Sequence, residues 1–250
     1  MKDKQESGSI SAVESLQAAT EKCYSTYNSR RRLDRDSLLR NPEVLFQSLA
    51  RDAAMVRALG SIDPDPHSAR VLDVGCGDGD GLWILVRLGF EPANLFGVDI
   101  QEDRIRKAKA KIPLVKFECA DATSLRFRDG TFDIVMESMM FLQLTDEEIA
   151  SRIASEMIRV TKLGGTLLVS DWRYSKPGSR EFKGVSASRI ANLYQVGTRT
   201  EVRQTIRGLL IPPVGRFLSK YLPSSYFMVH ALCPLLVGHR ITVLRKVKNS

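Results

Sequence analysis

The middle of the chain alternates short apolar runs with amphipathic stretches. Apolar runs occur at residues 70–74 (RVLDV), 95–100 (LFGVDI), 132–137 (FDIVME) and 165–171 (GTLLVSD). The stretches between them, such as DRIRKAKAKI, have apolar residues at helical spacing. This alternation predicts parallel strands joined by crossover helices, which is the arrangement of an α/β fold.

The chain before this region predicts an N-terminal helical cap over residues 10–66, preceded by a polar stretch, residues 1–9, that we expect to be disordered. The helices are interrupted near Asn28 to Asp36 and at Asn41-Pro42. Apolar residues at helical spacing predict the buried face of the last helix of the cap: Val44, Leu45, Leu49, Ala53, Val56 and Leu59.

Residues 173–250 follow a different pattern. A polar loop precedes a short helix predicted over 186–194, and residues 211–238 form an apolar but interrupted segment that predicts about two helices. The final ITVLRKV predicts a closing strand. The expected organisation is therefore a single domain, 1–250, with a core over 67–172 and a C-terminal region that contains the insertion 211–238.

One helix end has a recognisable capping pattern. Thr145 is followed three residues later by Glu148, which predicts a capping box at the start of a helix over 146–161. Leu163-Gly164-Gly165 predicts its stop.

The composition is that of an ordinary globular chain. Its 250 residues are 43% hydrophobic and 26% charged, which excludes a disordered, collagen-like or repeat protein. The longest apolar stretch, 221–238, contains prolines, serines and a histidine, so it predicts no membrane span. Asp3 and Glu6 stand where an export signal needs an apolar run, so we expect a cytoplasmic protein. The four cysteines form no CxxC pair, and we expect neither a disulfide framework nor a metal site.

Charge is distributed unevenly along the chain. Residues 71–170 carry 12 basic and 16 acidic side chains, whereas residues 171–250 carry 14 basic and only 3 acidic ones, a net charge of +11. A charge excess often marks only a solvated surface. The alternative is that the last third meets an anion, such as a phosphate, a nucleotide sugar, a lipid head group or nucleic acid.

The most specific motif is VLDVGCGDG, residues 71–79, where a buried strand leads into a glycine turn and then a helix. Glycines allow positive φ and close approach of a ligand, and a helix start offers unpaired N–H groups. A dinucleotide fingerprint would need its third glycine at position 80, but Asp80 is there. Asp73, Asp78 and Asp80 would repel a pyrophosphate and favour a cationic, nucleotide-like ligand.

Acidic residues also end the next two predicted strands. Asp99 is placed to accept hydrogen bonds from both hydroxyls of a ribose, and Asp121 is placed for the exocyclic amine of a purine. Because the ends of parallel strands meet at one sheet edge, Asp73, Asp99 and Asp121 should line one crevice. Each alone could be a helix N-cap, but three together favour a binding site.

These motifs resemble the class I, Rossmann-like S-adenosylmethionine-dependent methyltransferases. VLDVGCGDG, GVDI, CADA, FDIVMES and RVTKLGGTLLVSDW match their successive motifs over residues 70–172. The resemblance implies a seven-stranded, mostly parallel sheet with helices on both faces, and S-adenosylmethionine as cofactor. It implies that Asp73, Gly75 and Gly77 surround the methionine moiety, that Asp99 binds the ribose, that Asp121 and Ala122 lie at the adenine, and that Glu137 lies beside the sulfonium. The full set of expected cofactor-binding residues is Asp73, Gly75, Cys76, Gly77, Asp78, Asp99, Ile100, Asp121, Ala122 and Glu137.

The rest of the chain is more loosely similar to methyltransferases of bacterial surface-polysaccharide and natural-product pathways. Methyl transfer from a sulfonium depends mainly on proximity and alignment, and an acceptor hydroxyl would also need a base. The candidate bases are His239, Asp171 and Tyr174. His239 could instead be a capping or packing residue, and Asp171 could orient its neighbours. Tyr24 and Tyr27 could fold over the cofactor as a lid or simply pack a helix.

We expect the acceptor pocket to be formed by the N-terminal helices and the insertion. Arg207, Arg216 and Lys220 suit anions, whereas Phe217, Tyr221, Tyr226, Phe227 and Met228 suit apolar or ring surfaces. The mixture suits a phosphorylated or nucleotide-linked sugar, or a lipid-borne one, and leaves peripheral membrane contact and the oligomeric state open. The expected function is methyl transfer to a hydroxyl of a sugar or natural-product intermediate.

The alternatives are an RNA or protein methyltransferase and a non-enzymatic binding protein. The chain carries MESM where many amino-group methyltransferases carry NPPY or DPPY, and it has no appended RNA-binding module. Nucleic acid is therefore a disfavoured partner. An NAD-dependent oxidoreductase is excluded by Asp80 and by the lack of a recognisable Tyr-x-x-x-Lys pair.

Overall fold

The computed structural model describes residues 42–175, 178 and 181–249, and its centre is one seven-stranded sheet. The strand order is β3-β2-β1-β4-β5-β7-β6. Strands β1 to β5 run parallel, and β7 is antiparallel to both of its neighbours. The strands are β1 (Val71–Val74), β2 (Leu95–Asp99), β3 (Lys116–Cys119), β4 (Phe132–Ser138), β5 (Thr161–Trp172), β6 (Thr200–Arg207) and β7 (His239–Lys246). The fold predicted from the sequence is confirmed.

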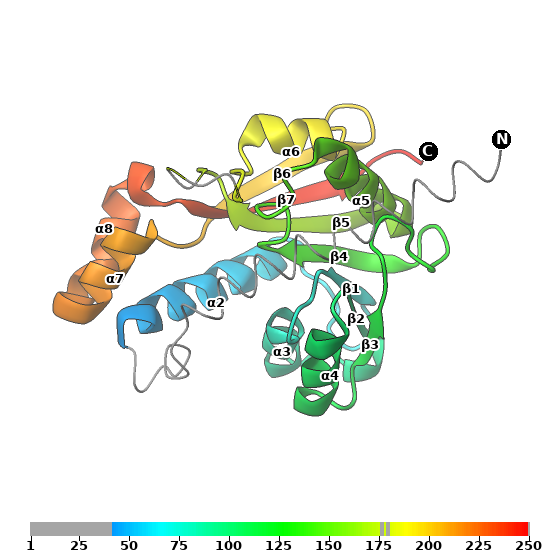
Figure 1. Ribbon diagram of the computed structural model, residues 1–250, viewed down its shortest axis with the longest axis horizontal. Helices are drawn as coiled ribbons and strands as arrows, with labels where there is room; N and C mark the ends of the chain where they lie inside the picture. Colours follow the sequence, from blue (N-terminus) through cyan, green and yellow to red (C-terminus); the bar gives the residue numbers. More distant parts are fainter. Residues whose placement is uncertain (1–41, 176–177, 179–180, 250) are drawn as a thin grey trace. The chain divides into compact units, whose positions relative to one another are not determined.

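Helices cover both faces of this sheet (Figure 1). The α-helices are α2 (Leu45–Gly60), α3 (Asp80–Arg87), α4 (Glu102–Lys111), α5 (Glu147–Val160), α6 (Ala187–Leu193), α7 (Pro212–Tyr221) and α8 (Tyr226–Leu232). Four short 3₁₀ turns complete the description: η1 (Pro42–Val44), η2 (Pro92–Asn94), η3 (Pro223–Ser225) and η4 (Pro234–Leu236). Within these residues, no helix is both long enough and apolar enough to cross a membrane.

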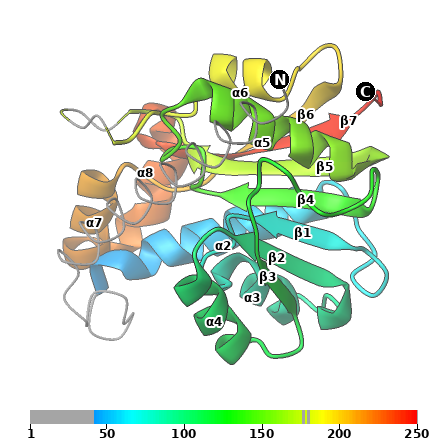
Figure 2. The ribbon, with the colours of Figure 1, turned by 45° about the vertical axis from the view of Figure 1, so that its right-hand side comes forward.

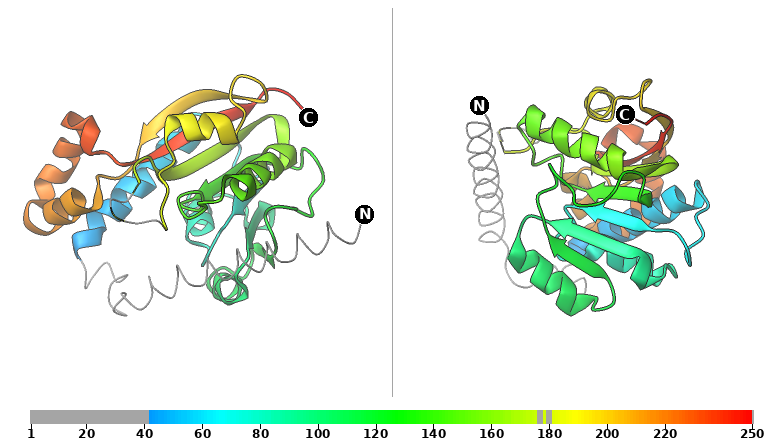
Figure 3. Two further views of the ribbon diagram at one scale, coloured as in Figure 1. Left: turned by 45° about the horizontal axis from the view of Figure 1, so that its top comes forward. Right: turned by 90° about the vertical axis from the view of Figure 1, so that its right-hand side faces the viewer.

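The two faces of the sheet are built differently. The larger core joins one face to α2, α3 and α4, through residues such as Met55, Leu82 and Ile105. On the other side, Ala150, Ile153 and other buried residues of α5 face β4 and β5; Figure 2 and Figure 3 show α5 and α2 on opposite sides of the sheet. All four residues of β1 are buried, because a central parallel strand is covered on both faces.

The start of α5 differs from its expected capping box. Asp146, not Thr145, is the N-cap, and its side chain accepts hydrogen bonds from the N–H groups of Glu148 and Ile149 at 2.9 and 3.2 Å. An Asp oxygen one residue later satisfies the same exposed N–H groups. Gly164 and Gly165 lie inside β5, near an irregularity in its pairing with β4, and the helix ends earlier, at Val160.

The predicted buried face of α2 is wrong in part. Leu49 and Val56 are exposed, whereas Gln47, Ala50 and Ala54 are buried. The helix is covered along a different stripe because the segment 211–238, which we call the insertion, packs on its N-terminal half. Trp83 on α3 is also exposed.

The insertion has a small core of its own against α2 (Figure 2). Leu218 and Tyr226 pack with Ala50, and the Tyr226 hydroxyl donates a hydrogen bond to Gln47 Oε1 at 3.2 Å. Gly215 lies so close to Gln47 that a Cβ at position 215 would collide with its amide. The two-helix prediction for this segment is confirmed by α7 and α8.

Candidate active site

The glycine turn after β1 lies at the edge of the sheet where β1, β2 and β4 end, and we call this region the crevice. Gly75 and Gly77 adopt φ values of +72° and +55°, which L side chains rarely adopt. A Cβ at Gly75 would lie 2.9 Å from the Met140 sulfur, so Met140 covers this turn. The turn is held to β2 by the Gly75 and Cys76 N–H groups, which donate to the Val98 carbonyl at 2.8 and 3.0 Å.

Asp73, on β1, is buried beside this turn. The side chain is 2% exposed, and Oδ1 has no hydrogen-bond partner among the described residues. Burial, together with the nearby carboxylates of Asp99 and Asp80, raises the pKa of Asp73 to about 8. A buried acid of this kind is stabilised in its ionised form by a cation.

Asp99 ends β2 beside the same turn. Its Oδ2 accepts a hydrogen bond from the Gly77 N–H at 2.9 Å, and its Oδ1 accepts one from the Gln101 N–H at 2.9 Å. Each carboxylate oxygen can accept a further bond. Asp99 therefore positions the glycine turn and can still bind hydroxyl groups.

The remaining predicted cofactor residues lie along the same strand ends. Asp121 follows β3 and is hydrogen-bonded within its own turn, to the Thr123 N–H at 2.8 Å and the Thr123 hydroxyl at 2.7 Å. Ala122 lies in that turn, and Ile100 directly follows β2. Cys76 is buried, and this burial raises the pKa of its thiol.

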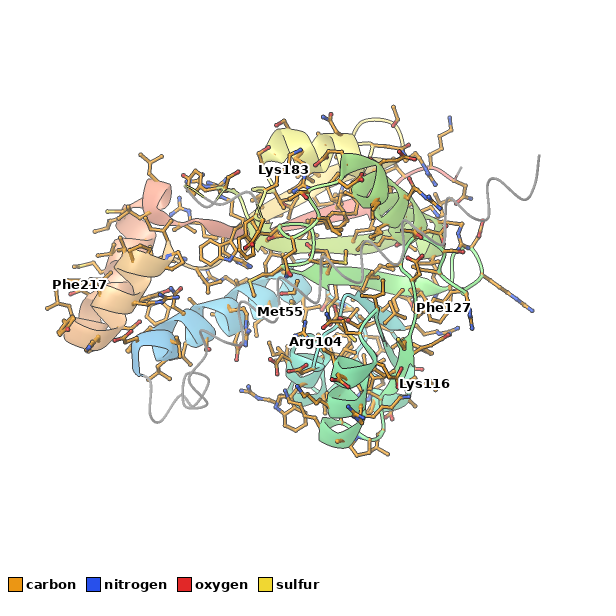
Figure 4. All side chains as sticks on the ribbon, viewed as in Figure 1. Met55, Arg104, Lys116, Phe127, Lys183 and Phe217 are labelled. Carbon is orange, nitrogen blue, oxygen red and sulfur yellow. The ribbon has the colours of Figure 1, made fainter. Side chains whose placement is uncertain are left out.

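Arg104 is a neighbour of the crevice that the sequence analysis missed. It forms an ion pair with Asp78, Nε to Oδ1, at 3.0 Å. Its guanidinium also lies within 2.6 Å of where a Cβ on Gly77 would be, and Figure 4 labels it beside α4. Asp78 is thus engaged by a basic side chain from α4, a long-range contact that sequence spacing does not reveal.

Glu137 joins the end of β4 to β5 and to the following turn. It is 1% exposed, and its two carboxyl oxygens accept hydrogen bonds from the Met140 N–H at 3.0 Å and the Ser170 N–H at 2.9 Å. Burial and the nearby Asp171 raise its pKa well above the usual value. This arrangement supports Met139, whose φ is +57°.

Asp171 and Arg189 hold the next part of the same loop, residues 139–146. Asp171 Oδ2 accepts a hydrogen bond from the Leu142 N–H at 2.8 Å. Arg189, buried on α6, donates to the carbonyls of Phe141 and Leu144 at 3.0 and 2.5 Å. Burial raises the pKa of Asp171 to about 7, although Arg189 partly opposes this. Arg189 was also missed, since a single arginine in a short helix carries no sequence signal.

The three candidate bases are not brought together. Asp171 faces the Leu142 and Arg189 side of the sheet. His239 packs against Gly208 and Trp172, and its Nε2 lies 3.3 Å from Ser170 Oγ.

Burial, with a smaller effect of Arg51, lowers the pKa of His239 to about 3. Tyr174 is half-exposed and donates its hydroxyl hydrogen to the Leu235 carbonyl at 3.1 Å. The three side chains therefore have separate surroundings, and a shared catalytic constellation is not formed.

Known proteins resemble this chain in both sequence and fold. A family described as a methyltransferase domain matches residues 71–165. The chain is 37% identical over 117 residues to 2-methyl-6-phytyl-1,4-hydroquinone methyltransferase of Synechocystis sp., covering 45% of this chain and 35% of that protein. It is 31% identical over 187 residues to phthiotriol/phenolphthiotriol dimycocerosates methyltransferase 1 of Mycobacterium ulcerans, covering 66% of each.

Among solved structures, magnesium protoporphyrin IX methyltransferase from Synechocystis with bound S-adenosylmethionine has a TM-score of 0.57. It is 15% identical and covers 84% of each chain. This structure shows that the fold is shared, and the sequence matches show the family. The chain belongs to the class I S-adenosylmethionine-dependent methyltransferases. The cofactor is S-adenosylmethionine.

The methyltransferase crevice fits this cofactor. The unpaired, buried oxygen of Asp73 suits a ligand with a positive charge, and Gly75 and Gly77, both with positive φ values, expose backbone at two positions of the turn. In the described part of the chain, no group of three or more histidine, cysteine or acidic residues suits a metal ion.

The chain spans about a third to two thirds of the length of the two relatives above. The predicted contacts of Asp99, Asp121 and Glu137 with the cofactor stay predictions, and Tyr24 and Tyr27 lie outside the described residues.

Proposed function

We propose that this methyltransferase transfers a methyl group to a hydroxyl oxygen of a small-molecule acceptor, a sugar or natural-product intermediate with an apolar part. S-adenosylmethionine supplies an electrophilic methyl group and an excellent leaving group. The acceptor oxygen forms a bond to the methyl carbon while the carbon–sulfur bond breaks and leaves its electron pair on sulfur. The hydroxyl proton passes to a base, and the products are a methyl ether and S-adenosylhomocysteine.

The observation that carries this proposal is the unpaired Asp73 carboxyl in the crevice beside the glycine turn. Asp73 and Asp99 come from adjacent parallel strands, since Asp73 pairs in register with Gly97. Two buried acids beside this turn favour a cationic nucleoside over a dinucleotide phosphate. The chemistry of the ligand therefore follows from charge as well as from family.

Asp171 is the strongest of the three candidate bases. Its pKa of about 7 is close to a physiological pH, where a general base is most effective. His239, with a pKa of about 3, is neutral but a weak proton acceptor. Each Asp171 oxygen accepts one backbone hydrogen bond and can accept another.

The apolar part of the acceptor is supported by two observations. The insertion, attached at the same sheet edge as the ends of β5 and β6, carries many exposed apolar side chains. The two relatives are named for a phytyl hydroquinone and for phthiotriol dimycocerosates. An RNA or protein acceptor remains the alternative, supported by the net charge of +11 over residues 171–250.

The test is a product assay with the full chain. Purified protein and S-adenosylmethionine are incubated with a long-chain quinol, a glycosylated lipid, a nucleotide sugar or tRNA, and products are identified by mass spectrometry. We expect a methyl ether of a small molecule. Methylation of tRNA alone, or of carbon or nitrogen alone, would overturn the proposal.

Two variants then separate the candidate bases. Asp171→Asn should lower kcat by about 10² to 10³ if Asp171 accepts the proton, and it should remove the acidic limb near pH 7 from the pH profile. His239→Gln should lower kcat less and leave that limb in place. The reverse pattern would assign the base to His239.

A further inference from the structure

The outer surface of the insertion is unusually apolar for a surface exposed to water. Seven of its large apolar side chains are between 43% and 78% exposed. They are Phe217, Tyr221, Leu222, Phe227, Met228, Leu232 and Leu235. We call this set the apolar surface. Apolar side chains gathered in this way mark an interaction site.

The residues of the apolar surface lie on one side of each helix, and other apolar residues of the same helices are buried. On α7, Phe217 and Tyr221 are one turn apart, with ring centroids at 5.3 Å, while Leu218 on the next position is buried. On α8, Tyr226 and His230 are buried, whereas Leu232 is 73% exposed. Figure 4 shows Phe217 pointing away from the sheet. Each helix therefore has a buried inner face and an exposed outer face.

Basic residues run beside the apolar surface. Arg216 and Lys220 are one helical turn apart on α7, directly next to Phe217 and Tyr221. They are the two basic residues of the insertion, which contains no aspartate or glutamate. Lys220 forms an ion pair with Glu43, with Nζ 3.1 Å from Oε1. A helix with aromatic and aliphatic residues next to basic ones is typical of segments that lie in a membrane interface.

We propose that the apolar surface docks on a lipid bilayer that contains anionic head groups. The apolar side chains enter the boundary between head groups and acyl chains, and Arg216 and Lys220 contact the lipid phosphates. A second copy of the chain fits less well, because a symmetric contact would bring Arg216 of both insertions together, and neither insertion contributes a carboxylate. The charge of the surface thus selects an anionic partner.

This docking would place the crevice near the lipid. Arg173 and Tyr174, which directly follow β5, donate hydrogen bonds to the Leu235 carbonyl at 3.2 and 3.1 Å. The end of the insertion is therefore connected to the edge of the sheet that carries Asp171 and Trp172. The docking proposal does not require the proposed reaction, because it rests on the outer surface alone.

The experiment is co-sedimentation of the full chain with vesicles. One vesicle contains phosphatidylcholine only, and the other contains phosphatidylcholine with about one third phosphatidylglycerol. We expect binding to the anionic vesicles, weakened at high salt because the lipid charge is screened. Leu232→Ser and Leu235→Ser should each weaken binding by about tenfold, and Arg216→Gln by about fivefold.

The matched control is Leu163→Ser, which removes an exposed leucine from β5 far from the insertion. It should bind vesicles like the unchanged chain. Binding of S-adenosylmethionine and the melting temperature show whether each variant is folded, and Leu235→Ser, at 78% exposed in the short turn η4, is the variant least able to disturb the core.

Three results would overturn the proposal. The first is that the full chain binds neither vesicle. The second is that Leu163→Ser weakens binding as much as Leu235→Ser does. The third is that the chain elutes as a dimer that Leu232→Ser converts to a monomer, which would assign the apolar surface to a second copy. Failure of the product assay with intact vesicle binding would refute only the proposed reaction.

Discussion

The crevice half of the molecule buries charged side chains, whereas the insertion exposes apolar ones. Around the crevice, Glu137, Asp171 and Arg189 are buried, and each is held by backbone N–H or carbonyl groups. The insertion buries no charged side chain and instead exposes its apolar ones. Buried charges with fixed partners give a rigid site, whereas exposed apolar residues remain available to a partner. The first half is built to hold a small ligand and the second to meet a surface.

The strongest way to test this contrast is to remove Arg189. Arg189→Met should lower the free energy of unfolding by about 3 kcal/mol, because it leaves the Phe141 and Leu144 carbonyls and the Glu147 carboxylate without their cation. It should also lower kcat, since loop 139–146 would lose its anchor. Chemical denaturation and kinetics check both effects.

The control for Arg189 is Arg152→Met, an exposed arginine on α5. It should change stability by less than about 0.5 kcal/mol. Equal effects of the two substitutions would contradict the role of Arg189 in holding loop 139–146. They would also contradict the view that buried charged residues organise this half of the molecule.

Asp99 tests whether the crevice half binds the cofactor. Asp99→Ala should weaken S-adenosylmethionine binding by about a hundredfold, because the substitution removes the acceptor of the Gly77 and Gln101 N–H groups. Calorimetric titration measures the loss.

Asp103→Ala, an exposed acid on α4, is the matched control and should bind normally. Vesicle binding should be the same in both variants. Loss of vesicle binding in Asp99→Ala would show that the two halves are coupled.

The smallest expected effect is the pH dependence of cofactor binding. The pKa of Asp73 is raised to about 8 in the folded chain, so the folded state holds a proton that the unfolded chain releases near pH 4. Stability contributed by this group is present at low pH and decreases as pH rises from about 4 to 8. A cationic ligand prefers the ionised form, so affinity should rise about fivefold between pH 7 and pH 8.

Asp73→Asn should flatten this dependence. Titrations at pH 6, 7 and 8 on both proteins make the comparison, with vesicle binding as a measurement that the substitution should leave unchanged. An affinity that is independent of pH in the unchanged chain would contradict the role of Asp73 as the counter-charge.

The sequence was most informative about features that depend on neighbouring residues or on patterns repeated along the chain. Alternating apolar runs predicted the sheet, and acids after successive strands predicted the edge at which Asp73, Asp99 and Asp121 lie. Each of these features depends on neighbours in the chain or on the rule that parallel strands end together. The two helices of the insertion were predicted for the same reason.

Long-range contacts limited the rest. Arg104 and Arg189 reach the site from helices, and nothing in their local sequence distinguishes them from surface arginines. The buried face of α2 was partly wrong because Gln47 faces α7 and Tyr226, contacts that only the folded chain defines. His239 and Asp171 were grouped as candidate bases because both lie at strand ends, but alternation along β5 and β7 sends them to different sides of the sheet.

The close approach of Gly215 to Gln47 has a consequence for engineering. A methyl group at position 215 would displace the Gln47 amide, so Gly215→Ala should break its hydrogen bond with Tyr226 and loosen the packing of α7 and α8 while the strands keep their pairing. Engineering of the range of acceptors for this methyltransferase could therefore begin with Gly215→Ala.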